Sequence, residues 1–559
     1  MFLYCTAGKI IVLATFLFVF SGQATIHMGR YLSTRQSLVS TLLFVLYLVA
    51  LLLFISLPFI KYKHIIIDGI SGLFLVAFPH LFTDDLLQNP YRYVESATSF
   101  QLLGAHGDFL PVNAPELGMF VVGKPGCGKT KFVIEPILFR MIAKGYGGML
   151  YDYDFSNDTG SNYSLSQLAY NCHLRSLHKT RFLNINFQDL TVSARINPIA
   201  AHYIEDRKKL SQSLRTFLIN LNPDLAHKED FWQKNTYALL KSLVVFLANK
   251  HPLYCSLPHV IMMGLQSSDV LKNVLTSDEE AKLYASPVLD ALENAPEQFA
   301  GVIANFKVSL QRLLDPTIFW VLSGDEVPCL LNDPKDPIVL SLGNTPSQKD
   351  VLSPVLAMSI AALVSNMYGH ERNKSFVMID ELPTLFLPPL NNIPATARKY
   401  KIATVLALQT VAQLEKTYGV LGARELQETF GNLVVGRSSF RLSKELSDTF
   451  GSKTVHATSQ TVSDVQRMSS TTRHSKEKAV LEPQKIMTLD VGEFAGRVAD
   501  SGEGFFKIKL KPISAYHSAL RAENLKPLPV VHQDVDIVRN FNQIKQEIKN
   551  LVGVYNHDE

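Results

Sequence analysis

One eight-residue motif constrains the fold of this chain more than any other feature. Residues 123–130 read GKPGCGKT and follow directly on a short apolar run, residues 117–122. Glycines at these positions let successive backbone N–H groups curl around an anion, and a helix that starts after them adds its positive end. Residues 131–144 carry the apolar spacing of such a helix. A strand, a glycine loop and a helix in this order predict a phosphate-binding loop.

The side chains of this loop predict the ligand. Lys129 is placed to reach the β- and γ-phosphates of a nucleotide, and Thr130 to hold Mg²⁺. We therefore expect ATP and Mg²⁺ as cofactors. The residues assigned to nucleotide binding are Gly123, Pro125, Gly126, Cys127, Gly128, Lys129, Thr130 and Lys131.

A second motif supplies the acidic residues that hydrolysis of a nucleotide needs. The apolar residues 375–379 run straight into Asp380 and Glu381. Asp380 is the predicted partner of Mg²⁺, and Glu381 is the predicted base that orients and deprotonates the attacking water. The alternative is an acidic pair at the surface end of a strand, and the phosphate loop upstream in the same chain favours the catalytic interpretation.

Apolar segments alternate with helical ones along the middle of the chain, which predicts a parallel sheet covered on both faces. The further predicted strands are residues 148–153, 181–187, 337–342, 402–408 and 431–435. Ligands of such sheets bind beyond the carboxyl ends of the strands, where residues 123–130, Asp380 and Gln409 fall. We expect Gln409 to lie beside the nucleotide and to read its γ-phosphate. The predicted fold is α/β, a RecA-like P-loop NTPase core with a parallel sheet.

The N-terminal region carries the membrane signal. Residues 38–57 form a run of twenty residues without a charge, the length that crosses a hydrocarbon core about 30 Å thick. Residues 8–26 are a second candidate, for which a cleaved signal peptide is the alternative. Residues 64–82 contain Asp68 and Pro79 and are expected as a re-entrant segment, an interfacial helix or a third span. We therefore expect two N-terminal transmembrane helices, or three, and the flanking basic residues leave the topology open.

Charge and cysteine usage narrow the function classes further. The formal net charge is only +4, so contact with nucleic acid has to come from a local patch or an assembled ring. The five cysteines show no CxxC pair and no metal-ligand spacing, which predicts reduced thiols. Cys127 lies inside the phosphate loop, where we expect a bulky adduct on its sulfur to fill the phosphate site.

Residues 375–437 carry the clearest resemblance to a known family. They contain DELPTL, ARKYKI and LQTVAQLEKTYG in this order, followed by Asn432 before the next strand. These motifs resemble the type IV coupling proteins of bacterial conjugation, the TraG/TraD kind, within the FtsK/HerA group of motors. Looser matches at residues 196–199, 231–232 and 481–483 extend the resemblance over about residues 100–520. The turn at residues 151–155 departs from the family pattern.

The resemblance implies a setting and partners. It implies a multi-pass protein of the bacterial inner membrane with its ATPase domain in the cytoplasm, assembled as a homo-hexamer. The implied partners are single-stranded DNA bound by a relaxase, the relaxosome proteins and components of a type IV secretion channel.

The resemblance also gives Arg398 a role, that of an arginine finger that reaches the neighbouring subunit's nucleotide. From the residues alone, with Lys399 and Lys401 beside it, a solvated helix residue is the simpler interpretation. The expected catalytic set is then Lys129, Glu381, Arg398 and Gln409.

The expected organisation has five parts. They are a membrane anchor (1–90), the first part of the ATPase core (91–200), an inserted all-α domain (201–333), the second part of the core (334–528) and an amphipathic tail (529–559). The resemblance links the inserted domain to recognition of the substrate.

Three features of these parts keep alternatives open. Phe231 and Trp232 either stack on bases or belong to the core. Residues 455–478, rich in Ser and Thr, predict a mobile loop that either faces a DNA channel or is simply solvated. Apolar residues at spacings of 4 and 3 between residues 537 and 551 predict an amphipathic helix, docked on its own domain or offered to a partner.

The leading hypothesis is a coupling ATPase that accepts relaxase-bound DNA, or protein substrates, and feeds them to the secretion channel. A related alternative is a double-stranded DNA translocase of the FtsK kind. For that class we expect a DNA-reading winged-helix domain, for which the chain has no room after Val530. An alternative of a different class is a membrane receptor that binds nucleotide but works mainly as a docking platform, with little hydrolysis.

Overall fold

A computed structural model gives the fold of the region that follows the N-terminal apolar stretches. It describes residues 92–156, 163–223, 231–388, 390, 393–463, 468–500 and 505–555. The three predicted membrane segments, residues 8–26, 38–57 and 64–82, lie outside the described residues. Residues 90–559 form one compact unit.

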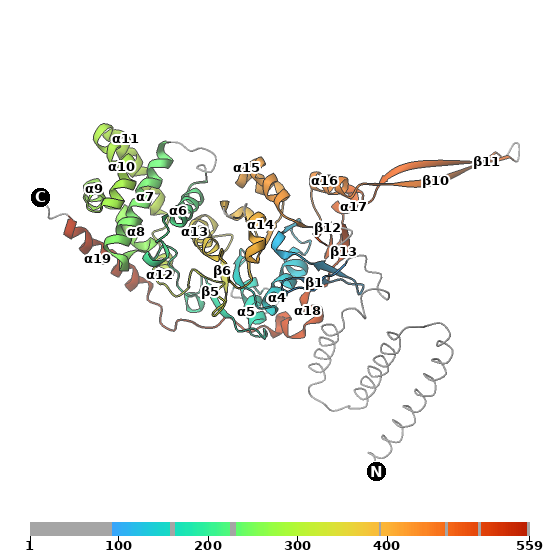
Figure 1. Ribbon diagram of the computed structural model, residues 1–559, viewed down its shortest axis with the longest axis horizontal. Coiled ribbons are helices and arrows are strands. Elements are labelled where there is room, and N and C mark those ends of the chain that lie inside the picture. Colours follow the sequence, from blue (N-terminus) through green and yellow to red (C-terminus); the bar gives the residue numbers. More distant parts are fainter. Residues whose placement is uncertain are drawn as a thin grey trace, which may run out of the picture. The chain divides into compact units, whose positions relative to one another are not determined.

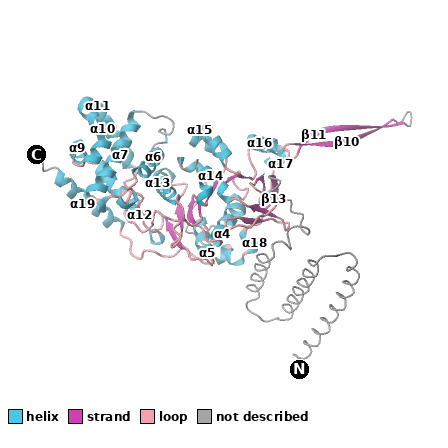
Figure 2. Ribbon diagram, viewed as in Figure 1, coloured by secondary structure: helices cyan, strands magenta, loops and turns pink. Residues whose placement is uncertain are grey.

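The centre of this unit is a nine-stranded sheet in the order β13-β12-β9-β3-β8-β7-β4-β6-β5 (Figures 1 and 2). Its strands are β3 (Met119–Val122), β4 (Gly147–Asp152), β5 (Arg181–Ile185), β6 (Ile338–Gly343), β7 (Ser375–Ile379), β8 (Ile402–Leu408), β9 (Asn432–Val435), β12 (Glu493–Arg497) and β13 (Phe505–Lys509). The strands from β9 to β5 are parallel, and β12 and β13 pair antiparallel at one edge. The predicted parallel sheet is confirmed, because each predicted strand segment overlaps a parallel strand of this sheet.

Both faces of the sheet are covered, as continuous apolar strands require. On β7, Phe376 and Met378 join a buried cluster with residues of α4 (Glu135–Ala143) and α5 (Leu165–His173). The intervening Val377 and Ile379 join the cluster on the other face. A short hairpin, β1 (Phe100–Leu103) and β2 (Phe109–Val112), packs into the first cluster.

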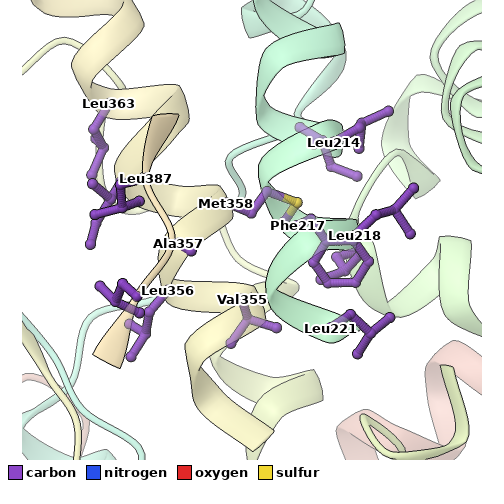
Figure 3. Packing of buried hydrophobic residues seen from close by; sticks show 14 of the residues in the cluster. Leu214, Phe217, Leu218, Leu221, Val355, Leu356, Ala357, Met358, Leu363 and Leu387 are labelled. Carbon is purple, nitrogen blue, oxygen red and sulfur yellow. The ribbon is translucent and has the colours of Figure 1, made fainter. Parts of the chain in front are cut away.

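The second face is covered by α6 (Arg207–Leu221) and α13 (Lys349–Met367). Leucines and Phe217 of α6 pack against Val355 and Met358 of α13 (Figure 3). Within the part of the chain that the structure describes, α13 is the one helix long and apolar enough to cross a membrane, and 78% of its apolar window is buried. Its burial against α6 makes it a core helix.

A region of helices lies between β5 and β6. After α6 it contains α7 (Phe231–Lys250), α8 (Leu257–Gly264), α9 (Ser268–Thr276), α10 (Glu279–Asn294), α11 (Pro296–Gln311) and α12 (Pro316–Leu322). Local sequence starts several of them, because Ser267, Asp278 and Asp315 accept hydrogen bonds from the first free N–H groups of α9, α10 and α12. Phe231 and Trp232 open α7, and their side chains lie outside what the structure describes.

The prediction of a loop at residues 455–478 is wrong. These residues form a hairpin of β10 (Ser452–Ser463) and β11 (Met468–Ala479), paired from Ser452↔Ala479 to Ser463↔Met468. It projects away from the sheet (Figure 1). A run of Ser and Thr reads as a loop from composition, but β-branched Thr and Val also favour extended backbone. The long-range pairing of two such runs is what makes the ribbon.

The remainder of the fold comprises α14 (Ile393–Thr396), α15 (Val411–Thr429), α16 (Phe440–Phe450), α17 (Pro483–Met487), α18 (Ile513–Tyr516) and α19 (Ile537–Tyr555). α19 resolves the alternative left open for the tail, because it docks on its own chain. Ile544, Ile548 and Leu551 are buried in the core cluster, and the Phe541 ring lies 4.8 Å from that of Phe319 in α12. The last helix is therefore part of the helical region.

This docking predicts the effect of a charge on α19. Ile548 is 1% exposed, so Ile548→Asp would bury an unpaired carboxylate and leave its apolar neighbours without a partner. We expect it to destabilise the helical region by about 3–5 kcal/mol, measured as a lower midpoint in thermal unfolding and as faster proteolysis at α19. Val538→Asp is the matched control, since Val538 lies on the same helix and is 62% exposed. Equal effects of the two variants would contradict the docking.

Candidate nucleotide site

The glycine loop after β3 adopts a conformation that only this sequence pattern allows easily. Gly126 and Gly128 have φ of 75° and 91°, the left-handed region in which a side chain is strained. The start of the loop is held against the ends of β8 and β9, since Gly123 N–H donates to Leu408 O (3.2 Å) and Lys124 N–H donates to Arg437 O (2.7 Å), two residues after β9. A short π-helical segment, Thr130–Ile134, then leads into α4. The loop therefore presents backbone N–H groups and a helix start beyond the end of the sheet.

Three side chains predicted from two separate motifs lie at this edge. Lys129 Nζ donates to Gly123 O at 2.7 Å, so the ammonium folds back over its own loop. Thr130 Oγ1 donates to Asp380 Oδ1 at 3.3 Å, although the two residues are 250 positions apart in the chain. The sheet brings them together because β3 and β7 are parallel and separated only by β8.

The acidic pair after β7 lies in an environment that disfavours its charges. Burial raises the pKa of Asp380 to about 6, with the neighbouring Glu381 adding to the rise and Lys129 opposing it. Burial also raises the pKa of Glu381, against the opposing effect of Lys129. A cation placed between these carboxylates would relieve their repulsion.

The donor set fits Mg²⁺ better than a metal held by protein ligands alone. Among the described residues, no three His, Cys, Asp or Glu side chains form a group that could hold a metal ion. Mg²⁺ commonly takes one or two protein oxygens and completes its shell with water and phosphate oxygens. Thr130 and Asp380 supply such oxygens.

Gln409 lies beside Glu381, and the expectation that it reads a γ-phosphate stays a prediction. Both its backbone N–H and its side-chain amide hydrogen-bond to the carboxylate of Glu381, which favours the charged form of that group. In this arrangement Gln409 orients the acidic residue.

Two buried carboxyls behind the site were not assigned a role from the sequence. Asp152 ends β4 and accepts hydrogen bonds from Ser166 N–H (2.8 Å) and Ser166 Oγ (2.7 Å), while burial raises its pKa to about 7. Glu135 in α4 accepts from Tyr163 OH at 2.8 Å, and burial raises its pKa to about 7 as well. Asp152 was visible as the acidic end of a predicted strand, but no local pattern distinguished Glu135.

The raised pKa values of Asp152 and Glu135 determine how the stability of the protein depends on pH. The folded pKa of each group lies above its unfolded value, so the folded state binds more protons between about pH 4 and pH 7. Ionising these carboxyls therefore lowers stability progressively as the pH rises through that range.

Arg398 does not join the site within one chain. It lies in a short turn, Ala397–Tyr400, that precedes β8, and it is exposed. The amino end of β8 is the opposite edge of the parallel sheet from the phosphate loop, which follows the carboxyl end of β3. Arg398 can therefore meet a nucleotide only on another copy of the chain.

The expectation that an adduct on Cys127 would fill the phosphate site stays a prediction, but burial shields the thiol in the folded protein. Cys127 is 1% exposed. Its Sγ lies under the loop, 2.6 Å and 3.0 Å from where Cβ atoms on Gly123 and Gly436 would stand. The sulfur fills the space between two glycines, and the residue contributes its backbone to the loop.

Comparison with known proteins adds to this geometry. Residues 165–494 match the family described as type IV secretory system conjugative DNA transfer. No curated protein sequence matches the chain. The solved structure of the bacterial conjugative coupling protein TrwBdeltaN70, in an unbound monoclinic form, is similar over 75% of this chain and 90% of that chain, with 18% identity and a TM-score of 0.56.

Two further structures of the plasmid coupling protein TrwB are similar at 18% identity and a TM-score of 0.55. One is in complex with the non-hydrolysable ATP analogue ADPNP and covers 75% of this chain and 90% of its own. The other is in complex with ADP and Mg²⁺ and covers 78% and 91%. At this identity the likeness shows a shared fold.

The position of Cys127 predicts its reactivity. A thiol packed between two backbone segments is shielded from reagents in solution. We expect iodoacetamide to leave Cys127 unmodified in the folded protein and to modify it fully in urea, as measured by mass spectrometry of the peptide that contains it. Rapid labelling of Cys127 in the folded protein would show that the sulfur faces solvent.

Proposed function

This chain belongs to the type IV secretory system conjugative DNA transfer family, and we propose that it works there as a coupling ATPase. It would recruit relaxase-bound DNA, or protein substrates, and drive them into the secretion channel by hydrolysis of ATP. The observation that carries this proposal is the meeting of Lys129, Thr130 and Asp380 at the carboxyl edge of the sheet. The TrwB structures with ADPNP and with ADP and Mg²⁺ support ATP and Mg²⁺ as its cofactors.

Each residue of the site has a distinct task in the proposed reaction. The backbone of residues 123–130 and Lys129 would hold the phosphates, and Thr130 and Asp380 would hold Mg²⁺, which neutralises charge on the transferring phosphoryl group. Glu381 would accept a proton from the attacking water. The hydrogen bonds from Gln409 favour the charged form of its carboxylate, against the opposing effect of burial, and would orient it for that step.

The proposal includes the setting of the motor. Residues 1–90 would anchor it in the inner membrane as a multi-pass segment, and the core, residues 91–200 and 334–528, would lie in the cytoplasm. Residues 201–333 would form the inserted domain that receives the relaxosome and its single-stranded DNA.

We further propose a homo-hexameric ring in which Arg398 of one subunit completes the nucleotide site of the next. The exposure of Arg398 at the sheet edge opposite the phosphate loop supports action in trans, because head-to-tail contacts between copies place opposite surfaces against each other.

The role of Glu381 as the base can be tested by substitution. Glu381→Gln keeps the size of the side chain and its hydrogen-bonding partners but removes the proton acceptor. We expect ATP binding to be retained and hydrolysis to fall by about 10²-fold or more, measured by nucleotide titration and by phosphate release. The matched control is Asp350→Asn, an exposed carboxylate at the same edge of the sheet, which should leave the rate unchanged. If Glu381→Gln loses ATP binding to the same extent as hydrolysis, Glu381 is structural.

Variants of Lys129 and Arg398 test ATP hydrolysis and the action of Arg398 between subunits together. Lys129→Ala should hydrolyse no ATP and support no DNA transfer. Arg398→Ala should bind ATP normally and hydrolyse poorly, since an arginine finger contributes about 10³–10⁵ in rate. In a mixed ring of the two variants, an intact phosphate loop can face an intact arginine. We expect ATPase activity to return in part on mixing, with DNA present and at concentrations that favour oligomers.

Three results would count against this proposal. Transfer at the normal frequency with Lys129→Ala excludes a motor role. Unimpaired hydrolysis by Arg398→Ala excludes the arginine finger. A mixture that stays inactive although mixed oligomers form excludes action of Arg398 across the interface.

A further inference from the structure

The C-terminal segment crosses the whole compact unit before it ends. After β13, at one edge of the sheet, residues 511–536 run past the core to α19, which packs on the helical region (Figure 1). We call residues 511–536 the strap. It lies along the helices that follow the phosphate loop and β4, so it contacts the core near elements that carry the nucleotide site.

The strap is fastened to α4 and α5. Its His517 ring lies 5.2 Å from that of Phe139 in α4. In α5, the buried Asn171 binds the backbone of Lys526 in both directions, accepting from its N–H at 2.9 Å and donating to its carbonyl at 2.8 Å. Gln167 donates to the same carbonyl at 3.2 Å. A buried amide that pairs with both groups of one peptide fixes the position of the strap.

The same helix is fastened to the nucleotide edge at its other end. Ser166, in the first turn of α5, donates twice to Asp152 at the end of β4. β4 is the sheet neighbour of β7, so Asp152 and Asp380 lie at the carboxyl ends of adjacent strands. A change of charge at Asp380 therefore acts on the anchor of α5.

Beyond α5 the strap is fastened to the helical region. Val531 N–H donates to Thr191 O at 2.7 Å. The His532 ring pairs with Glu326 at 3.0 Å and lies 4.9 Å from the ring of Trp320 in α12. α19 continues the attachment, with Glu547 at 3.0 Å from His259 of α8.

We propose that the strap couples the nucleotide edge of the core to the helical region, with Asn171 as the positioning residue that links α5 to it. The coupling rests on the proposed nucleotide site. Binding of nucleotide and Mg²⁺ at Asp380 changes the electrostatic environment of Asp152. Because Ser166 of α5 is hydrogen-bonded to Asp152, α5 shifts as well, and the strap transmits this shift to α12 and α19. An unbroken series of packed and hydrogen-bonded groups of this kind can carry energetic coupling between distant sites.

The test is hydrogen exchange of the full chain with and without a non-hydrolysable ATP analogue. We expect the analogue to slow exchange in residues 123–130 and to change exchange in α5, the strap, α12 and α19. In Asn171→Ala, the change in residues 123–130 and α5 should remain, and the change in the strap, α12 and α19 should be lost. Asn294→Ala is the matched control, since Asn294 is exposed on α10, and it should respond as the unsubstituted chain does.

A second variant protects the test against a folding defect of Asn171→Ala. Lys526→Pro removes the N–H that Asn171 accepts and leaves α5 untouched. The position suits proline, because Pro527 already restricts Lys526 to extended backbone, and Leu525 has φ −74° and ψ 131°. We expect the same loss of response in α12 and α19.

The outcomes separate the coupling from the proposed function. No protection in residues 123–130 of the unsubstituted chain contradicts the nucleotide site itself. Protection there without any change in α12 and α19 overturns the coupling. A change in α12 and α19 that persists in both Asn171→Ala and Lys526→Pro overturns the role of the strap.

Discussion

Burial of the parallel strands on both faces is the constraint on which the rest of this structure depends. Strands covered by helices on each side favour apolar side chains along their length, and charged side chains gather where the strands end. Phe376 to Ile379 are wholly apolar and buried, and Asp380 follows immediately. The phosphate loop after β3 and Gln409 after β8 obey the same rule. One edge of the sheet thereby collects the groups that can act on a nucleotide.

The edge that results is electrostatically unbalanced. Burial raises the pKa values of Asp152, Asp380 and Glu381. Asp380 adds to the rise at Asp152 and Glu381 to the rise at Asp380, while Lys129 opposes it at Asp380 and Glu381. Such a site gains free energy when a cation arrives with a ligand. The same arrangement links the state of the site to the packing behind it, because Asp152 is also the anchor of α5.

The helical region and the tail show how distant segments complete a core. The apolar stripe of α19 packs on α8, α9 and α12 and covers them from solvent. The burial of Ile548 and Leu551 shows this packing. The strap precedes α19 in the chain, so the docking of α19 also fixes the path of the strap across the core. A packing requirement at the end of the chain thus creates the connection between its two halves.

The sequence by itself determined the elements and the order of the nucleotide edge. Glycine spacing, apolar runs and strand-end carboxylates are local patterns, and they are sufficient to predict the phosphate loop, Asp380, Glu381 and the parallel sheet. The sequence also predicted that these groups lie close together, because the carboxyl ends of parallel strands share one edge of the sheet.

Only the tertiary structure decided what depends on residues far apart in the chain. It placed the sulfur of Cys127 beneath its loop, against Gly436, and gave the amide of Gln409 to Glu381. It paired residues 452–463 with residues 468–479, and it docked α19 on its own chain. In each case the local sequence does not decide the conformation or the partner, because the contact that decides it comes from a residue far away in the chain.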